Sequence, residues 1–129
     1  MNSKRFDLKL DNKITSFSKT VAVDGDKSIS IRSFLIGSIS HNVSSVKNTL
    51  ESEDVFSAIN CLKKLGVKIL KKGKKNYLIN GKGLGSFFIK KKTKLNFGNS
   101  GTLARLIVGI LTSTPGVDLK VEGDHSLNK

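Results

Sequence analysis

The clearest structural pattern of this chain lies in residues 97–111, which read Phe-Gly-Asn-Ser-Gly-Thr-Leu-Ala-Arg-Leu-Ile-Val-Gly-Ile-Leu. A strand-like segment at 94–97 enters a glycine-containing turn. From Leu103 to Leu111, leucines and isoleucines then recur at i, i+3, i+4, i+7 and i+8, which is the spacing of one helix face. The stretch therefore predicts a strand, a tight turn and an amphipathic helix in succession.

Similar strand-like and helix-like segments alternate along the rest of the chain. Residues 28–40 read as a helix, and 52–66 as another, with Ser52 as its N-cap and Gly66 as its stop signal. Segments 67–70 and 76–79 flank a lysine- and glycine-rich tip and predict a β-hairpin. The remaining predicted strands are residues 6–10, 20–23, 45–50, 94–97 and 117–121. This order indicates an α/β (α+β) protein whose helices cover one face of a mixed sheet.

The charge of the chain is strongly positive, because 23 lysines and arginines face only 10 acidic residues among 129. An excess of this kind attracts anionic partners, so a small basic nucleic-acid-binding module is an alternative function. Lysines gather at 63–64, 71–75 and 90–92, at predicted helix ends and turns where solvated lysine is ordinary. Few aromatic side chains accompany them to stack on bases. Charge alone is a weak cue, and nucleic acid is therefore the less favoured partner.

Other features of the composition narrow the class of protein. A single cysteine, Cys61, and two histidines give no legible metal site, and Cys61 is predicted to pack beside a helix stripe rather than to act as a nucleophile. No apolar run approaches the roughly 20 residues of a membrane span, and the first residues lack a secretory pattern. We therefore expect a cytoplasmic protein with no metal and no membrane association.

Two segments, 24–32 and 98–105, have the character of anion-binding sites. Each runs from a glycine-containing turn through small hydroxyl residues into a predicted helix with an arginine about one turn inside. Helix N-termini carry unpaired N–H groups and a partial positive charge. Hydroxyls and full charges add to this, here from Ser28, Thr102, Lys27, Arg32 and Arg105. The pair of segments predicts a substrate with more than one anionic group.

Four segments of the chain, taken in order, carry a family resemblance. They are Gly-Asp-Lys-Ser-Ile-Ser-Ile-Arg at 25–32, Leu-Glu-Ser-Glu-Asp-Val at 50–55, Phe-Gly-Asn-Ser-Gly-Thr-Leu-Ala-Arg at 97–105 and Glu-Gly-Asp-His-Ser-Leu at 122–127. Together they resemble one enzyme family, EPSP synthase (3-phosphoshikimate 1-carboxyvinyltransferase). The sister transferase that acts on UDP-N-acetylglucosamine has Lys-Asn in place of Lys-Ser-Ile-Ser and is the alternative within the same fold.

The resemblance implies a reaction and a set of site residues. The enolpyruvyl group moves from phosphoenolpyruvate to shikimate 3-phosphate in aromatic amino acid biosynthesis, with no cofactor. By similarity, Lys27 is catalytic and contacts both substrates, while Ser28 and Arg32 hold shikimate 3-phosphate. The phosphoenolpyruvate site, which glyphosate occupies in this family, is implied for Gly101 and Arg105, with Asn99 and Thr102 as supporting residues. A glycine at position 101 resembles the glyphosate-sensitive form.

The resemblance also implies a fold, an inside-out α/β barrel built from βαβαββ units, and a monomeric full enzyme. Residues 1–23 correspond to entry strands of the first domain, and 24–129 to the first part of the second domain, truncated. Asp24 stands where a proline is usual, and Ile31 where a histidine is common. Members of the family are longer, and the arginine and proton-moving carboxylates expected beyond Lys129 are not in this sequence. We therefore expect an N-terminal fragment that does not turn over substrate by itself.

Overall fold

The computed structural model describes residues 7–9, 11, 16 and 18–128. Its regular elements all lie between residues 27 and 122. They are α1 (Lys27–Ile39), β1 (Val43–Val46), α2 (Glu53–Lys64), β2 (Lys68–Gly73), β3 (Asn76–Asn80), β4 (Lys94–Asn96), α3 (Gly101–Leu111) and β5 (Lys120–Glu122).

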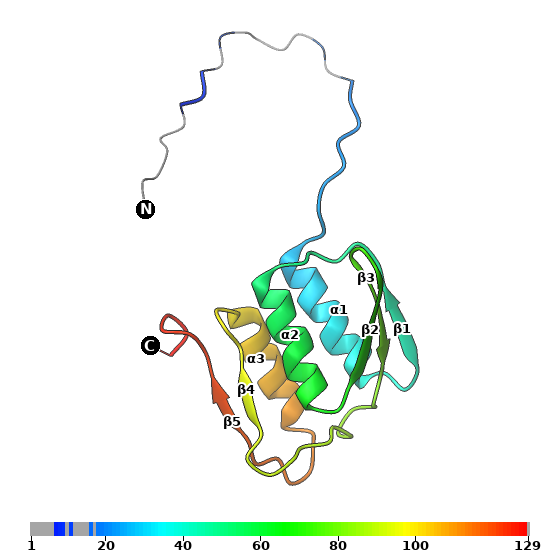
Figure 1. Cartoon of the computed structure of the whole chain (residues 1–129), viewed down its shortest axis with the longest axis vertical. Coiled ribbons are helices and arrows are strands. Elements are labelled where there is room, and N and C mark those ends of the chain that lie inside the picture. The colour runs from blue at the N-terminus through cyan, green and yellow to red at the C-terminus, as the bar shows by residue number, and fades with distance from the viewer. Residues whose placement is uncertain (1–6, 10, 12–15, 17, 129) are drawn as a thin grey trace.

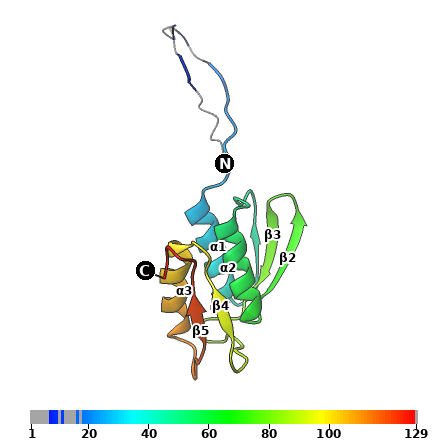
Figure 2. The same ribbon diagram turned by 60° about the vertical axis from the view of Figure 1, so that its left-hand side comes forward.

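The three helices lie side by side between two separate small sheets (Figures 1 and 2). One sheet is antiparallel with the strand order β1-β3-β2, and the other is a parallel pair of β4 and β5. The expectation of helices on a single mixed sheet is therefore wrong in detail, although the mixed α/β class is confirmed. The physical reason is that α3 joins β4 to β5 as a crossover, which lets these strands pair in parallel with each other.

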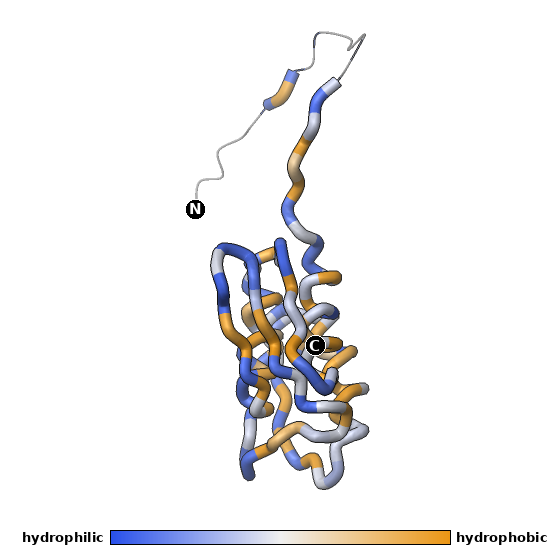
Figure 3. The backbone as a smooth tube through the Cα atoms, turned by 90° about the vertical axis from the view of Figure 1, so that its right-hand side faces the viewer, coloured by the Kyte–Doolittle hydropathy of each residue, from blue (hydrophilic) through white to orange (hydrophobic). Residues whose placement is uncertain are grey.

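The core forms where the apolar faces of the helices meet the sheets. Phe34 on α1 is fully buried and meets the Tyr77 ring edge-on, with 5.2 Å between the ring centroids. The predicted stripe of α2 is confirmed, since its five residues are at most 5% exposed: Val55, Ala58, Ile59, Leu62 and Leu65. Burial alternates along β3, where Tyr77 and Ile79 are buried, and hydrophobic residues lie beside hydrophilic ones throughout the helices and strands (Figure 3).

Most predicted elements are found within a few residues of their expected bounds. The hairpin is confirmed in β2 and β3, where Ile69 pairs with Ile79. Helix α2 ends at Lys64, and Gly66, the predicted stop signal, follows two residues later with a φ of +85° that suits glycine. On α3, however, Leu106 is 37% exposed, so the buried stripe is narrower than predicted.

Two strand predictions are wrong. Residues 20–23 form no strand, and Val21 and Val23 are 68% and 79% exposed, because no neighbouring strand pairs with this short apolar run. The strand expected at 45–50 lies instead at Val43–Val46. Past Val46 the chain turns away at Asn48, whose φ is +55°. The strand expected at 6–10 lies partly outside the described residues, and 7–9 have no regular structure.

The predicted domain boundary between residues 23 and 24 stays a prediction, and so does the inside-out α/β barrel.

Within the described part of the chain, no helix has the length and apolar character needed to cross a membrane.

Candidate functional site

The N-terminal ends of all three helices lie at the same end of the molecule, together with the tip of the β2–β3 hairpin (Figures 1 and 2). The two predicted anion-binding segments are the starts of α1 and α3. Because aligned peptide dipoles leave partial positive charge at each helix start, this end of the fold attracts anions.

The start of α1 is capped from within the first predicted segment. The Asp26 carboxylate accepts a hydrogen bond from the Ile29 amide at 2.7 Å, which satisfies one of the free N–H groups. Lys27 is the first helical residue, Ser28 is half-buried and Arg32 is exposed one turn further on. Within the described chain, neither the Ser28 hydroxyl nor the Arg32 guanidinium has a hydrogen-bond or ion-pair partner, so both can bind a ligand.

Lys27 does have a partner. Its ammonium lies 2.8 Å from the carboxylate of Asp54, in the first turn of α2, and the two side chains are 50% and 16% exposed. This hydrogen bond to Asp54 raises the pKa of Lys27 above its ordinary value, so the ammonium is charged at neutral pH. An anion at this position has to share Lys27 with Asp54. The sequence did not predict this pairing, although both residues lie in segments that carry the family resemblance.

The start of α3 is shaped by the turn that precedes it. Gly98 has a φ of +57°, and its amide donates to the Asn96 side chain at 2.7 Å. Ser100 caps the helix, accepting from the Leu103 amide at 3.3 Å. Thr102 is half-buried, and Arg105 is exposed with no partner in the described residues. The turn therefore leaves the Arg105 guanidinium available to a ligand.

Gly101 lies at the first position of α3, where an added side-chain carbon would not clash with the protein. A Cβ built there would meet only a methyl carbon of Leu127, at 4.0 Å, which is ordinary van der Waals contact. The role of Gly101 toward phosphoenolpyruvate stays a prediction.

The segment 122–127 supports that turn. The Asp124 amide donates to the Gly98 carbonyl at 2.8 Å, and the Ser126 hydroxyl donates to the Asn99 side chain at 3.3 Å. The Asp124 carboxylate in turn accepts from the amides of Ser126 and Leu127, both at 3.0 Å. Asn99 is therefore hydrogen-bonded to the segment 122–127, and the supporting role that the resemblance implies for it stays a prediction.

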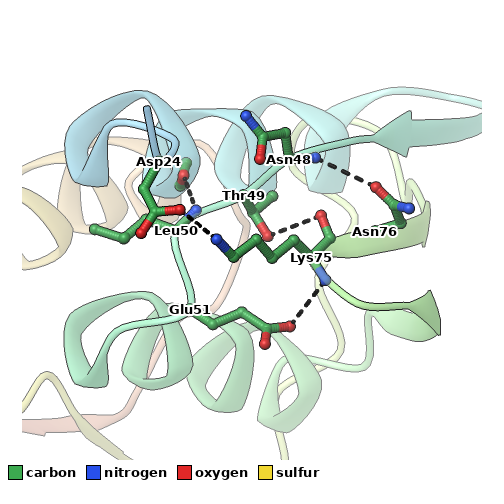
Figure 4. A network of polar contacts seen from close by, with 8 residues as sticks. Asp24, Asn48, Thr49, Leu50, Glu51, Lys75 and Asn76 are labelled. Atoms are coloured by element: carbon green, nitrogen blue, oxygen red, sulfur yellow. Dashed lines mark hydrogen bonds and ion pairs between the residues drawn. The ribbon is translucent and has the colours of Figure 1, made fainter. Parts of the chain in front are cut away.

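A second group of polar contacts lies beside the start of α1, and sequence reasoning missed it (Figure 4). Its centre is Glu51, just before α2, which accepts from the Tyr77 hydroxyl at 2.6 Å and lies 2.7 Å from the Lys71 ammonium. These contacts lower the pKa of Glu51 to about 2, and the hydrogen bond with Lys71 has the largest effect. No local pattern signals them, because Glu51 and Tyr77 are 26 positions apart.

The lowered pKa of Glu51 predicts a loss of stability in acid. A carboxyl whose pKa is about 2 in the folded protein and ordinarily 4.5 stabilises the fold above pH 4.5, and this contribution disappears as the pH falls from about 4.5 to 2. We expect the free energy of unfolding, measured by urea denaturation, to fall across this range. The fall should be smaller in Glu51→Gln, and an equal fall in both proteins would contradict the assignment.

The larger hollows of the described surface lie away from the helix starts. One of about 570 Å³ borders the C-terminal half of α3 and the loop before β5, and another of about 590 Å³ lies beside Cys61 at the far end of α2. Neither is lined by Lys27, Ser28, Arg32 or Arg105. We place the site by its chemistry, since charged groups and free amides, not apolar hollows, bind small anions. The structure brings these groups to one end of the fold, and no hydrogen bond or ion pair in the described chain joins those of α1 to those of α3.

Comparison with known proteins identifies relatives of this chain. Residues 12–129 match the family model of EPSP synthase (3-phosphoshikimate 1-carboxyvinyltransferase). A 3-phosphoshikimate 1-carboxyvinyltransferase of Oceanobacillus iheyensis is 44% identical over 114 residues, which are 88% of this chain and 26% of that protein. One from Thermoanaerobacter sp. is 43% identical over 109 residues, 84% of this chain and 25% of its own length.

A solved structure shows the same fold. EPSP synthase from Acinetobacter baumannii superimposes with a TM-score of 0.77 at 34% identity, covering 84% of this chain and 24% of its own. This chain thus spans about a quarter of the length of the relatives that it matches. The family model covers nearly all of the sequence, and the chain belongs to the EPSP synthase family.

Proposed function

We propose that this chain supplies substrate-binding groups of a 3-phosphoshikimate 1-carboxyvinyltransferase. In this proposal the start of α1 binds shikimate 3-phosphate through Lys27, Ser28 and Arg32. The start of α3 binds phosphoenolpyruvate through Gly101 and Arg105, with Lys27 shared between the two substrates. One observation carries the proposal: two arginines without a partner among the described residues lie about one turn inside two helix starts at the same end of the fold.

The chemistry of the transfer fits such a site. Both substrates are anions, and the reaction exchanges a phosphate leaving group for an ether linkage. Arginine forks and helix N-termini hold phosphate and carboxylate groups in fixed orientation, so the protein contributes positioning and electrostatic stabilisation. Lys27, kept charged beside Asp54, is the residue that we propose acts on both substrates.

The element order supports the finer proposal for the fold. From α1 to β3 the chain runs α-β-α-β-β, which is a βαβαββ unit without its first strand, and β4-α3-β5 begins a second such series. We propose that these are successive repeats of the family's inside-out barrel.

Calorimetric titration at low salt tests the function. Because the chain spans about a quarter of its relatives' length, binding rather than turnover is the informative measurement. We expect saturable binding of shikimate 3-phosphate, and at least tenfold weaker binding of shikimate, which lacks the phosphate, since charge-assisted hydrogen bonds each contribute roughly 1.5–3 kcal/mol. Equal affinity for both compounds would contradict the proposal. Tight binding of an RNA oligonucleotide with a steep salt dependence would favour the nucleic-acid alternative instead.

A further inference from the structure

Glu51 connects three points of the β2–β3 hairpin to the linker before α2. Its carboxylate accepts from the Tyr77 hydroxyl on β3 at 2.6 Å, contacts the Lys71 ammonium on β2 at 2.7 Å and accepts from the Lys75 amide in the turn at 3.3 Å. The Glu51 side chain is only 21% exposed, and Tyr77 is 5% exposed. Removal of this carboxylate would therefore leave several donors of the hairpin without their acceptor.

The tip of the hairpin in turn contacts the segment before α1 (Figure 4). The Lys75 carbonyl accepts from the amide and the hydroxyl of Thr49, at 3.0 and 3.2 Å. The Lys75 ammonium forms an ion pair with Asp24, two residues before the Asp26 cap of α1. The tip is thus bound both to the linker and to the entry into α1.

The linker is also bound directly to the first turn of α1. The Leu50 amide donates to the Ser30 hydroxyl at 2.9 Å, and this hydroxyl donates to the Asp26 carbonyl at 2.7 Å. A Cβ on Gly25 would lie 2.2 Å from the Asn48 carbonyl oxygen, so the two backbones touch with no room between them. Any shift of the linker is therefore transmitted to the start of α1.

Glu51 also acts through α2, which begins two residues later at Glu53. The first turn of α2 carries Asp54, the ion-pair partner of Lys27. If the Glu51 carboxylate fixes the position of the α2 start, it also fixes the position of Asp54 and of the Lys27 ammonium that pairs with Asp54.

We propose that Glu51 is a positioning residue for the anion-binding end of α1, holding Lys27 and Ser28 in place through the hairpin tip and the linker. The proposal rests on the proposed function for the identity of the anion, shikimate 3-phosphate. Glu51 itself does not touch the substrate.

The test compares Glu51→Gln with Glu53→Gln, which removes the same charge from an exposed neighbour that has no side-chain hydrogen bond or ion pair in the described chain. Amide hydrogen exchange separates positioning from general stabilisation. In Glu51→Gln, exchange at the Ile29 and Ser30 amides should rise roughly tenfold, while the core amides of Leu62 and Ile79 stay protected. Shikimate 3-phosphate should bind roughly three- to tenfold more weakly. Glu53→Gln should change neither quantity.

Tyr77→Phe is a second, milder variant that removes one donor to Glu51 and keeps the ring that packs on Phe34. In this variant, amide exchange at Ile29 and Ser30 should rise less than in Glu51→Gln, with the core amides still protected. This measurement remains possible even if Glu51→Gln does not fold. Exchange that rises equally in α1 and in the core would overturn the proposal, because it indicates stabilisation alone. Faster exchange at Ile29 and Ser30 with unchanged affinity would also overturn it. A wild-type chain that does not bind shikimate 3-phosphate would refute the proposed function, and the exchange comparison would still show whether Glu51 fixes the start of α1.

Discussion

Gly25→Ala should lower the free energy of unfolding by roughly 2–3 kcal/mol, the range expected for overpacking at a rigid contact. The added Cβ would lie 2.2 Å from the Asn48 carbonyl oxygen and 3.1 Å from the Leu50 amide nitrogen. Both are backbone atoms, which cannot rotate away as a flexible side chain would. The linker has to move, and with it the contacts that bind the start of α1.

Gly109→Ala provides the matched control, because the same methyl group enters open space. Gly109 lies within α3, and a Cβ there has no atom within 4 Å. Alanine is the better helix former, so this variant should gain roughly 0.5–1 kcal/mol. Urea denaturation followed by circular dichroism measures both variants. A Gly25→Ala protein as stable as the wild type would show that the segment 24–26 does not pack against the linker as described.

Arg32→Ala and Arg105→Ala should each weaken the binding of a different substrate. If Arg32 holds shikimate 3-phosphate, its removal weakens that ligand roughly ten- to a hundredfold and affects phosphoenolpyruvate less, since a charge-assisted contact contributes about 1.5–3 kcal/mol. Arg105→Ala should weaken phosphoenolpyruvate more. Neither arginine forms an ion pair within the described chain, so each substitution removes a ligand contact and leaves no buried partner behind.

Lys72→Ala is the control for charge alone. Lys72 is exposed on β2 near the tip of the hairpin, and its substitution changes the net charge by the same amount. Titration at low salt should show less than a twofold change for either ligand, because exposed charges beyond direct contact are screened. Equal losses in all three variants would indicate a general electrostatic effect and would argue against two distinct sites.

The elements with strong local signals could be predicted from the sequence. Helix α2 has acidic residues in its first turn, lysines in its last turn and a glycine after it. Each of these signals depends only on residues a few positions away in the sequence. The hairpin and the starts of α1 and α3 are likewise local features. Lys27, Ser28, Arg32 and Arg105 therefore lie at helix starts as expected, although their roles toward substrate stay predictions.

Features that depend on distant partners could not be predicted in this way. Whether residues 20–23 form a strand depends on a neighbouring strand, and the described chain provides none. The division into two sheets follows from how α3 crosses between β4 and β5, which periodicity does not show. The contacts of Glu51 with Lys71 and Tyr77, and the pairing of Lys27 with Asp54, join residues 20 to 27 positions apart. Only the folded chain brings these groups together.

The most direct test of the two-part anion site is an amide chemical-shift map of the chain titrated first with shikimate 3-phosphate and then with phosphoenolpyruvate. We expect the first ligand to shift amides at 26–32 and the second to shift those at 98–105, with both series saturating. Shifts confined to the lysine clusters at 71–75 and 90–92, increasing linearly with ligand and removed by salt, would contradict this assignment.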